Sequence, residues 1–145
     1  MAGIVVGVDG SSHSRKALEW AAAEAATHNA ALTVLVVHQA VRDVYGRVSH
    51  YTEDADLTEK AKEAARAETE EVLSGLGAKP ASATVTAAHG LPADELIKAS
   101  QGADMLVVGR RGGGGFARLI MGSVSDQVGR YAHCPVLIVP PADEG

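Results

Sequence analysis

A glycine-rich segment near the C-terminal third of the chain carries the residues best suited to chemistry. Gly109 is followed by Gly112 and, after nine further residues, by Gly122-Ser123. The apolar run Met105–Val108 before it predicts a buried strand, and a helix is predicted from Ser123 to Ala132. Glycine permits positive φ angles and lets an oxyanion approach backbone N–H groups, and the start of a helix favours negative charge. The pattern therefore indicates a phosphate-binding loop.

Two further features of this loop bear on that interpretation. The glycine run at 112–115, taken alone, would favour a flexible linker. However, Ser123-Val-Ser-Asp126 has the spacing of a capping box, with Ser123 as the predicted N-cap of the last helix. A loop fixed at both ends is a better binding site than a spacer. We expect one of Arg110, Arg111 and Arg118 to contact phosphate through its guanidinium group.

The elements that must position this loop alternate along the chain. Continuous apolar runs predict strands buried on both faces, and amphipathic segments between them predict helices. This alternation is typical of an α/β protein with an open, mostly parallel five-stranded sheet and helices on both faces. The helix over 57–76 is expected to place Ala64 on its core side, and the aperiodic stretch 39–56 is expected to be a loop that forms a lid or a mobile segment. The predicted strands are 4–8, 32–38, 83–88, 105–108 and 135–139, and the predicted helices are 11–28, 57–76, 92–100 and 123–132.

Residues that directly follow the strands are the next candidates, because ligands of such sheets lie outside the carboxyl ends of the strands. These residues are Asp9, His38, Gly90 and Gly109. Asp9 has two interpretations, since a short carboxylate before a helix often forms an Asx turn or a cap. It could equally accept hydrogen bonds from a ribose hydroxyl or an adenine amine. Its position alone does not distinguish the two.

Composition and missing motifs exclude several classes of function. The chain has 145 residues, which predicts one domain, and its 13 basic and 18 acidic residues give a net charge of −5 that disfavours nucleic acid as a partner. No Gly-Lys pair occurs, so a P-loop is absent, and Gly7-Val-Asp-Gly-Ser-Ser12 is not a dinucleotide-binding fingerprint. The six histidines and Cys134 lack the spacing of metal ligands. The single cysteine and the lack of a signal peptide or a long apolar stretch predict a cytoplasmic protein outside membranes.

Together these motifs resemble those of the universal stress protein family. The G-x2-G-x9-G-S spacing of Gly109, Gly112, Gly122 and Ser123 is similar to the family's ATP-binding signature. The stretches 4–11, 90–93 and 122–139 resemble its opening strand, its turn after the third strand, and its closing helix and strand. The resemblance covers nearly the whole chain. It implies a parallel sheet in the order 3-2-1-4-5 and membership of the ATP-binding branch.

The resemblance also implies roles for individual residues. Asp9 and the backbone of Val37 would hold adenine and ribose, and the glycine-rich loop would line the phosphates of ATP, which is expected to bind together with Mg²⁺. A homodimer is implied through antiparallel pairing of the last strand, Val136–Val139. The implied nucleotide-binding residues are Val8, Asp9, Val37, Gly109, Arg110, Gly112, Gly122, Ser123, Val124 and Ser125.

The function that follows is an ATP-binding regulatory or sensing module in a stress response. Catalysis is not evident, because the loop has no lysine to meet the γ-phosphate and no carboxylate is clearly placed to orient a water molecule. Three alternatives stay open at this point. They are a slow ATPase or autophosphorylating enzyme with Ser123 or Ser125 as acceptor, a sensor of AMP or cyclic AMP, and a pure interaction protein.

Overall fold

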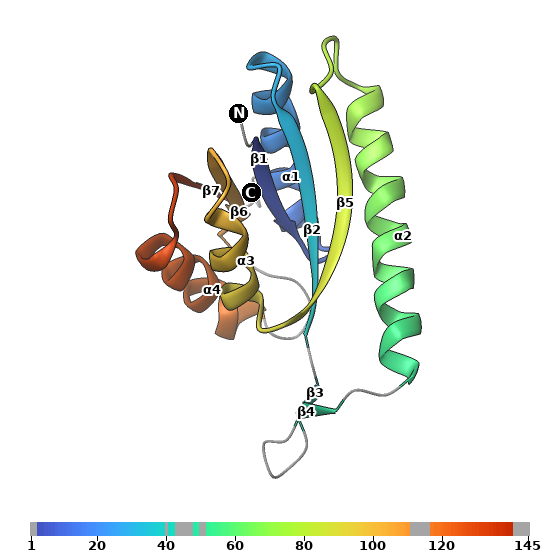
Figure 1. Ribbon diagram of the computed structural model, residues 1–145, viewed down its shortest axis with the longest axis vertical. Coiled ribbons are helices and arrows are strands. Elements are labelled where there is room, and N and C mark those ends of the chain that lie inside the picture. The colour runs from blue at the N-terminus through green and yellow to red at the C-terminus, as the bar shows by residue number, and fades with distance from the viewer. Residues whose placement is uncertain (1–2, 40, 43–47, 50–51, 111–116, 141–145) are drawn as a thin grey trace.

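The computed structural model describes residues 3–39, 41–42, 48–49, 52–110 and 117–140. Strands and helices alternate along the chain, as the sequence predicts (Figure 1). The elements are β1 (Ile4–Val8), α1 (Ser12–Thr27), β2 (Ala31–Gln39), β3 (Val41–Arg42), β4 (Val48–Ser49), α2 (Thr52–Ser74), β5 (Ser82–Gly90), α3 (Pro92–Ser100), β6 (Met105–Gly109), α4 (Ala117–Tyr131) and β7 (Val136–Val139).

Five of the strands form one parallel sheet in the order β5-β2-β1-β6-β7. Numbered among themselves along the chain, these strands lie in the order 3-2-1-4-5, which confirms the fold class and the strand order expected from the sequence. The continuous apolar runs of β1 and β6 occupy the middle of the sheet, where both faces are covered. The short strands β3 and β4 pair antiparallel with each other outside this sheet.

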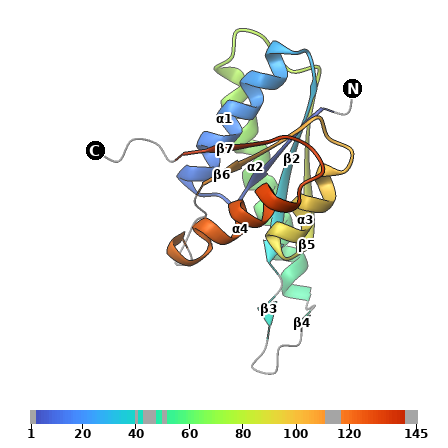
Figure 2. The same ribbon diagram turned by 90° about the vertical axis from the view of Figure 1, so that its left-hand side faces the viewer.

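Helices cover both faces of the sheet and divide the core into two clusters. On one face, Ile4, Val6 and Val8 of β1 pack with residues of α1 and α2, including four alanines of α1 that are fully buried. On the other face, Val5 packs with residues of α3 and α4. Figure 2 shows α1 and α4 on opposite sides of β6 and β7. Small alanine side chains let α1 approach the sheet closely, which explains an apolar core with few aromatic residues.

Three expectations about element boundaries are wrong. Helix α4 begins at Ala117 rather than Ser123, because residues 117–121 include alanine, arginine, leucine and methionine, which are strong helix formers. The predicted loop 39–56 contains the β3–β4 pair, in which β-branched Val41 and Val48 favour the extended backbone. It also contains the start of α2 at Thr52, where early acidic residues favour a helix N-terminus.

Ala64 is also misplaced by the sequence analysis, since it is exposed on α2. Within residues 58–74 of this helix, the buried residues Ala65, Thr69 and Val72 lie at spacings of four and three and form one stripe that excludes Ala64. None of the helices in the described part of the chain is both long and apolar enough to cross a membrane.

Candidate functional site

The carboxyl edge of the main sheet brings together the strand ends that the sequence singles out. β1 ends at Val8, which is paired with Val36 of β2, whereas β2 continues to Gln39 beside β5. From Val37 onward, β2 therefore keeps β5 as a neighbour but no longer runs beside β1. The backbone of Val37 lies next to the point where the chain leaves the sheet at Asp9. In Figure 1 these strand ends lie at the lower side of the sheet.

The neighbouring strands β1 and β6 form the topological switch point of this sheet. The chain passes from β1 to α1 on one face and from β6 to α4 on the other. Val6 is paired with Val107, so a continuation of this register places Val8 beside Gly109. On its other side Gly109 is paired with Val139, and the Arg110 N–H donates to the carbonyl oxygen of Val139 at 2.8 Å. Switch points are where open α/β sheets bind ligands.

Asp9 forms an Asx turn that leads from β1 into α1. Its Oδ1 accepts hydrogen bonds from the backbone N–H of Ser11 at 3.0 Å and from the Ser11 hydroxyl at 2.6 Å. Gly10, with φ of +85°, provides the left-handed conformation that this turn requires. The Asx-turn interpretation of Asp9 is thus confirmed. The turn also fixes the carboxylate at the edge of the sheet.

Ser11 is the N-cap of α1, which confirms one of the two residues predicted for this role. Its Oγ accepts from the N–H of Ser14 at 3.1 Å, and the Ser14 hydroxyl accepts from the N–H of Asp9, also at 3.1 Å. Ser14 is buried, with 4% of its surface exposed. These bonds hold the first turn of α1 against the end of β1, so the positive end of the helix dipole faces the carboxyl edge of the sheet.

Carboxylates from α2 also reach this region. Arg15 of α1 forms an ion pair with Glu71 at 2.8 Å, and its hydrogen bond to Glu71 raises the pKa of Arg15. The pKa of Glu68 is raised, mainly because the carboxyl group is partly buried. The positive charge of Arg15 acts to lower this pKa, and the negative charge of Asp9 acts to raise it. Asp9 and Glu68 are therefore close enough to influence each other. The sequence contains no signal for this proximity, because α2 is brought to α1 only by tertiary packing.

The glycine-rich loop is described only in part. Gly112 lies outside the described residues, whereas Gly109 and Arg110 lie at the end of β6 with the Arg110 side chain exposed. Gly122 and Ser123 lie within α4, so the prediction that Ser123 is the N-cap of this helix is wrong. Their contacts with phosphate stay a prediction.

The two residues that follow them in α4 face inward. Val124 is half-buried and packs against the core shared with α3, and Ser125 is 7% exposed. The burial of Ser125 counts against its hydroxyl as a phosphate acceptor, since an acceptor must reach the γ-phosphate.

Cys134 is a packing residue rather than a reactive thiol. It is half-buried and contacts the cluster that contains Leu106 and Val128. Burial raises the pKa of its thiol, and the nearby Asp104 carboxylate raises it further. The thiolate is therefore disfavoured at neutral pH. Across the ranges that the structure describes, no group of three or more His, Cys, Asp or Glu residues could hold a metal ion.

The sequence matches a protein-family model and several curated proteins. The model described as the universal stress protein family matches residues 2–140. A universal stress protein of Mycobacterium tuberculosis is 35% identical over 154 residues, which cover 95% of this chain and 48% of that protein. A universal stress protein of Thermus aquaticus is 34% identical over 139 residues, which cover 94% of this chain and 96% of that protein. This chain thus spans about half the length of several curated relatives that it matches.

Several solved structures of universal stress proteins have the same fold as this chain. The universal stress protein UspA of Lactobacillus plantarum has a TM-score of 0.73 and 21% identity over 95% of this chain and 97% of its own. A universal stress protein in complex with cAMP has a TM-score of 0.66 and 25% identity, with 97% of both chains covered. One from Archaeoglobus fulgidus in complex with dAMP has a TM-score of 0.64 and 22% identity over 94% of this chain and 96% of its own. The family match over nearly the whole sequence, together with this shared fold, shows that the chain belongs to the universal stress protein family.

Proposed function

We propose that this chain binds an adenine nucleotide at the carboxyl edge of the main sheet and acts as a regulatory module in the cytoplasm. The observation that carries the proposal is the fixed Asp9 carboxylate at the switch point between β1 and β6. Beside it, Val37 continues past the end of β1. A carboxylate and main-chain groups at one sheet edge suit the hydroxyl and amine groups of a nucleoside.

Adenine and ribose are assigned to the β1–β2 side of this edge, against Val8, Asp9 and Val37. A carboxylate accepts hydrogen bonds from ribose hydroxyls, and backbone N–H and C=O groups together match the edge of an adenine ring. The solved complexes with cAMP and dAMP support a nucleotide that contains adenine. The protein in the cAMP complex is 25% identical in sequence to this chain.

The phosphates are assigned to the β6–α4 side of the edge. Gly109 and Arg110 lie there in the structure, and the proposal adds Gly112 together with Gly122, Ser123, Val124 and Ser125 of α4. ATP is the proposed nucleotide because of the glycine spacing. Mg²⁺ would enter with the triphosphate, whose oxygens are its preferred ligands.

A second copy of the chain is proposed as the partner, paired antiparallel through β7. This strand lies at the edge of the sheet, and Ile138 exposes 39% of its surface there. An exposed apolar edge strand presents unpaired backbone groups that favour pairing with another strand.

Isothermal titration calorimetry on protein freed of bound nucleotide tests the proposed site. We expect ATP binding by the wild type and at least a tenfold loss in Gly122→Val, because the added side chain blocks the approach of phosphate. Gly129→Val is a matched control in the same helix, where an added Cβ would meet only the Cδ1 of Ile138 at 3.9 Å. ATP affinity that is equal in wild type and Gly122→Val would refute the phosphate assignment.

A cyclic AMP sensor is the second candidate, favoured by the structure in complex with cAMP. Competition titrations of AMP and cAMP against ATP, also by calorimetry, rank the affinities of the protein for the three nucleotides. Single-turnover assays with labelled ATP separately test hydrolysis and transfer to the protein. Phosphate release above background would establish the ATPase alternative.

A further inference from the structure

His13 in the first turn of α1 has a buried ring nitrogen with no hydrogen bond. Its Nδ1 is inaccessible, and no partner for it is found within the described part of the chain. The residue as a whole is only partly buried, so part of it reaches the surface. Buried polar atoms are nearly always paired, because an unpaired one costs free energy, and an exception in a native fold calls for an explanation.

The position of His13 relates it to the proposed nucleotide site. His13, Ala17 and Ala21 are spaced by four residues and form one stripe of α1, and both alanines are fully buried against the sheet. Helical side chains lean toward the helix N-terminus, which here lies at the carboxyl edge of the sheet. α1 packs across β1 and β6, and the hydroxyl of Ser14, next to His13 in the chain, accepts a hydrogen bond from the N–H of Asp9, so His13 begins this stripe at the end of β1, close to Asp9.

We propose that His13 is a phosphate-contacting residue of this site, whose ring N–H donates to a phosphate oxygen of the bound nucleotide. The inference rests on the proposed function and names a residue that neither the glycine spacing nor the Asx turn includes. In the proposed complex the ring turns about its Cβ–Cγ bond so that Nδ1 meets a phosphate oxygen, which supplies the missing partner. Phosphate suits this place better than ribose, because the N-terminus of α1 favours negative charge.

The test compares the affinities of AMP and adenosine, which differ only in the phosphate group. His13→Phe keeps the size of the ring and removes both nitrogens, whereas His13→Asn keeps a hydrogen-bonding group near the place of Nδ1. We expect His13→Phe to bind AMP about tenfold to a hundredfold more weakly, with adenosine unchanged, as for the loss of one hydrogen bond to a charged group. His13→Asn should recover most of this loss.

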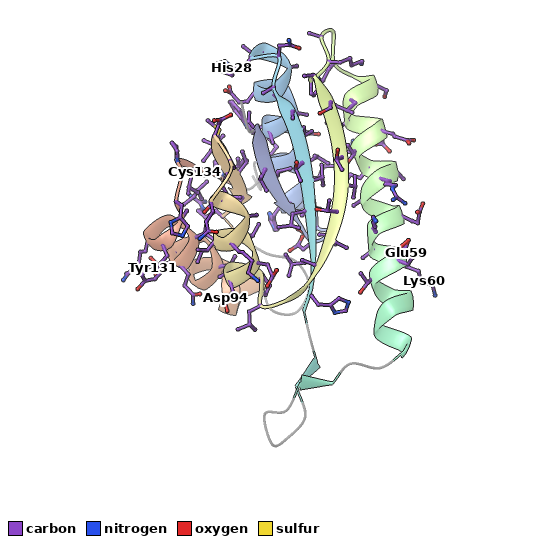
Figure 3. The ribbon with its side chains drawn as sticks, in the orientation of Figure 1. His28, Glu59, Lys60, Asp94, Tyr131 and Cys134 are labelled. Atoms are coloured by element: carbon purple, nitrogen blue, oxygen red, sulfur yellow. The ribbon has the colours of Figure 1, made fainter. Side chains whose placement is uncertain are left out.

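His28→Phe is the matched control, because His28 is exposed at the opposite end of the same helix, where it pairs with Glu24 (Figure 3). It should leave both affinities unchanged. As a readout that does not depend on variants, AMP but not adenosine should shift the ring ¹⁵N resonances of His13 in wild-type protein.

The outcomes separate this inference from the proposed function. Wild-type protein that binds neither compound overturns the proposed function and the inference with it. Wild-type protein that binds AMP no better than adenosine, or His13→Phe with the wild-type ratio of the two affinities, overturns the role of His13 alone. So does an unchanged His13 spectrum on addition of AMP. A purely structural role would alter the melting temperature of His13→Phe without altering this ratio.

Discussion

Replacement of Gly7 by alanine tests the close packing of α3 on β1, two residues before Asp9. A Cβ at Gly7 would lie 2.8 Å from Cδ2 of Leu96, 3.3 Å from its Cδ1 and 3.6 Å from its Cγ. Carbon atoms in contact normally lie about 3.5 to 4.0 Å apart. Leu96 is 4% exposed, so its side chain has little room to move away. The substitution should therefore overpack this part of the core.

The expected cost follows from two opposing effects. Overpacking of a core by one methyl group costs about 1 to 3 kcal/mol. The loss of glycine flexibility in the unfolded chain returns about 0.4 to 1 kcal/mol. Gly7→Ala should therefore lower the free energy of unfolding by about 1 to 2 kcal/mol, which corresponds to a fall in Tm of about 2 to 8 °C for a chain of this size.

Urea denaturation, followed by circular dichroism, measures the free energy of unfolding. Leu96→Ala alone should cost about 2 to 5 kcal/mol, but less in the Gly7→Ala background, because the shortened side chain removes the clash. Gly77→Ala is the control, since an added Cβ there meets no atom within 4 Å. Gly7→Ala with wild-type stability, or strictly additive effects of the two substitutions, would show that α3 does not pack on β1 in this way.

Two further predictions concern charge and assembly. Burial raises the pKa of Glu68 in the folded protein, and the charge of Asp9 adds to this effect. Protonation of Glu68 therefore stabilises the native state at low pH, and this stabilisation is lost as the pH rises through the raised pKa. Glu68→Gln should thus unfold at higher urea than wild type at pH 7 and at the same urea near pH 4; a gap that persists at pH 4 contradicts this. If the chain forms the proposed dimer through β7, Ile138→Lys at this edge should convert it to monomer in sedimentation equilibrium, and an unchanged mass would argue against pairing through β7.

Features with local causes could be predicted from the sequence. The apolar run of residues 4–8 specifies β1, the hydroxyl of Ser11 sets the start of α1, and Pro92 opens α3. Asp9 and Gly109 could be found as site candidates because they directly follow or end a buried strand, and parallel strands end at one edge. The order of the strands came from the family resemblance rather than from periodicity.

Other features depend on distances that sequence spacing does not encode. Strong helix formers extend α4 back to Ala117 and override the cap expected at Ser123. The proximity of Glu68 to Asp9 and the contact between Gly7 and Leu96 join segments that meet only when helices dock on the finished sheet. The amino-acid sequence therefore determined the five strands of the main sheet, the helices between them, and the sheet edge that is proposed to bind a ligand. Tertiary packing alone decided which charged and apolar side chains from distant segments lie near that edge, because such contacts form only once the layers are assembled.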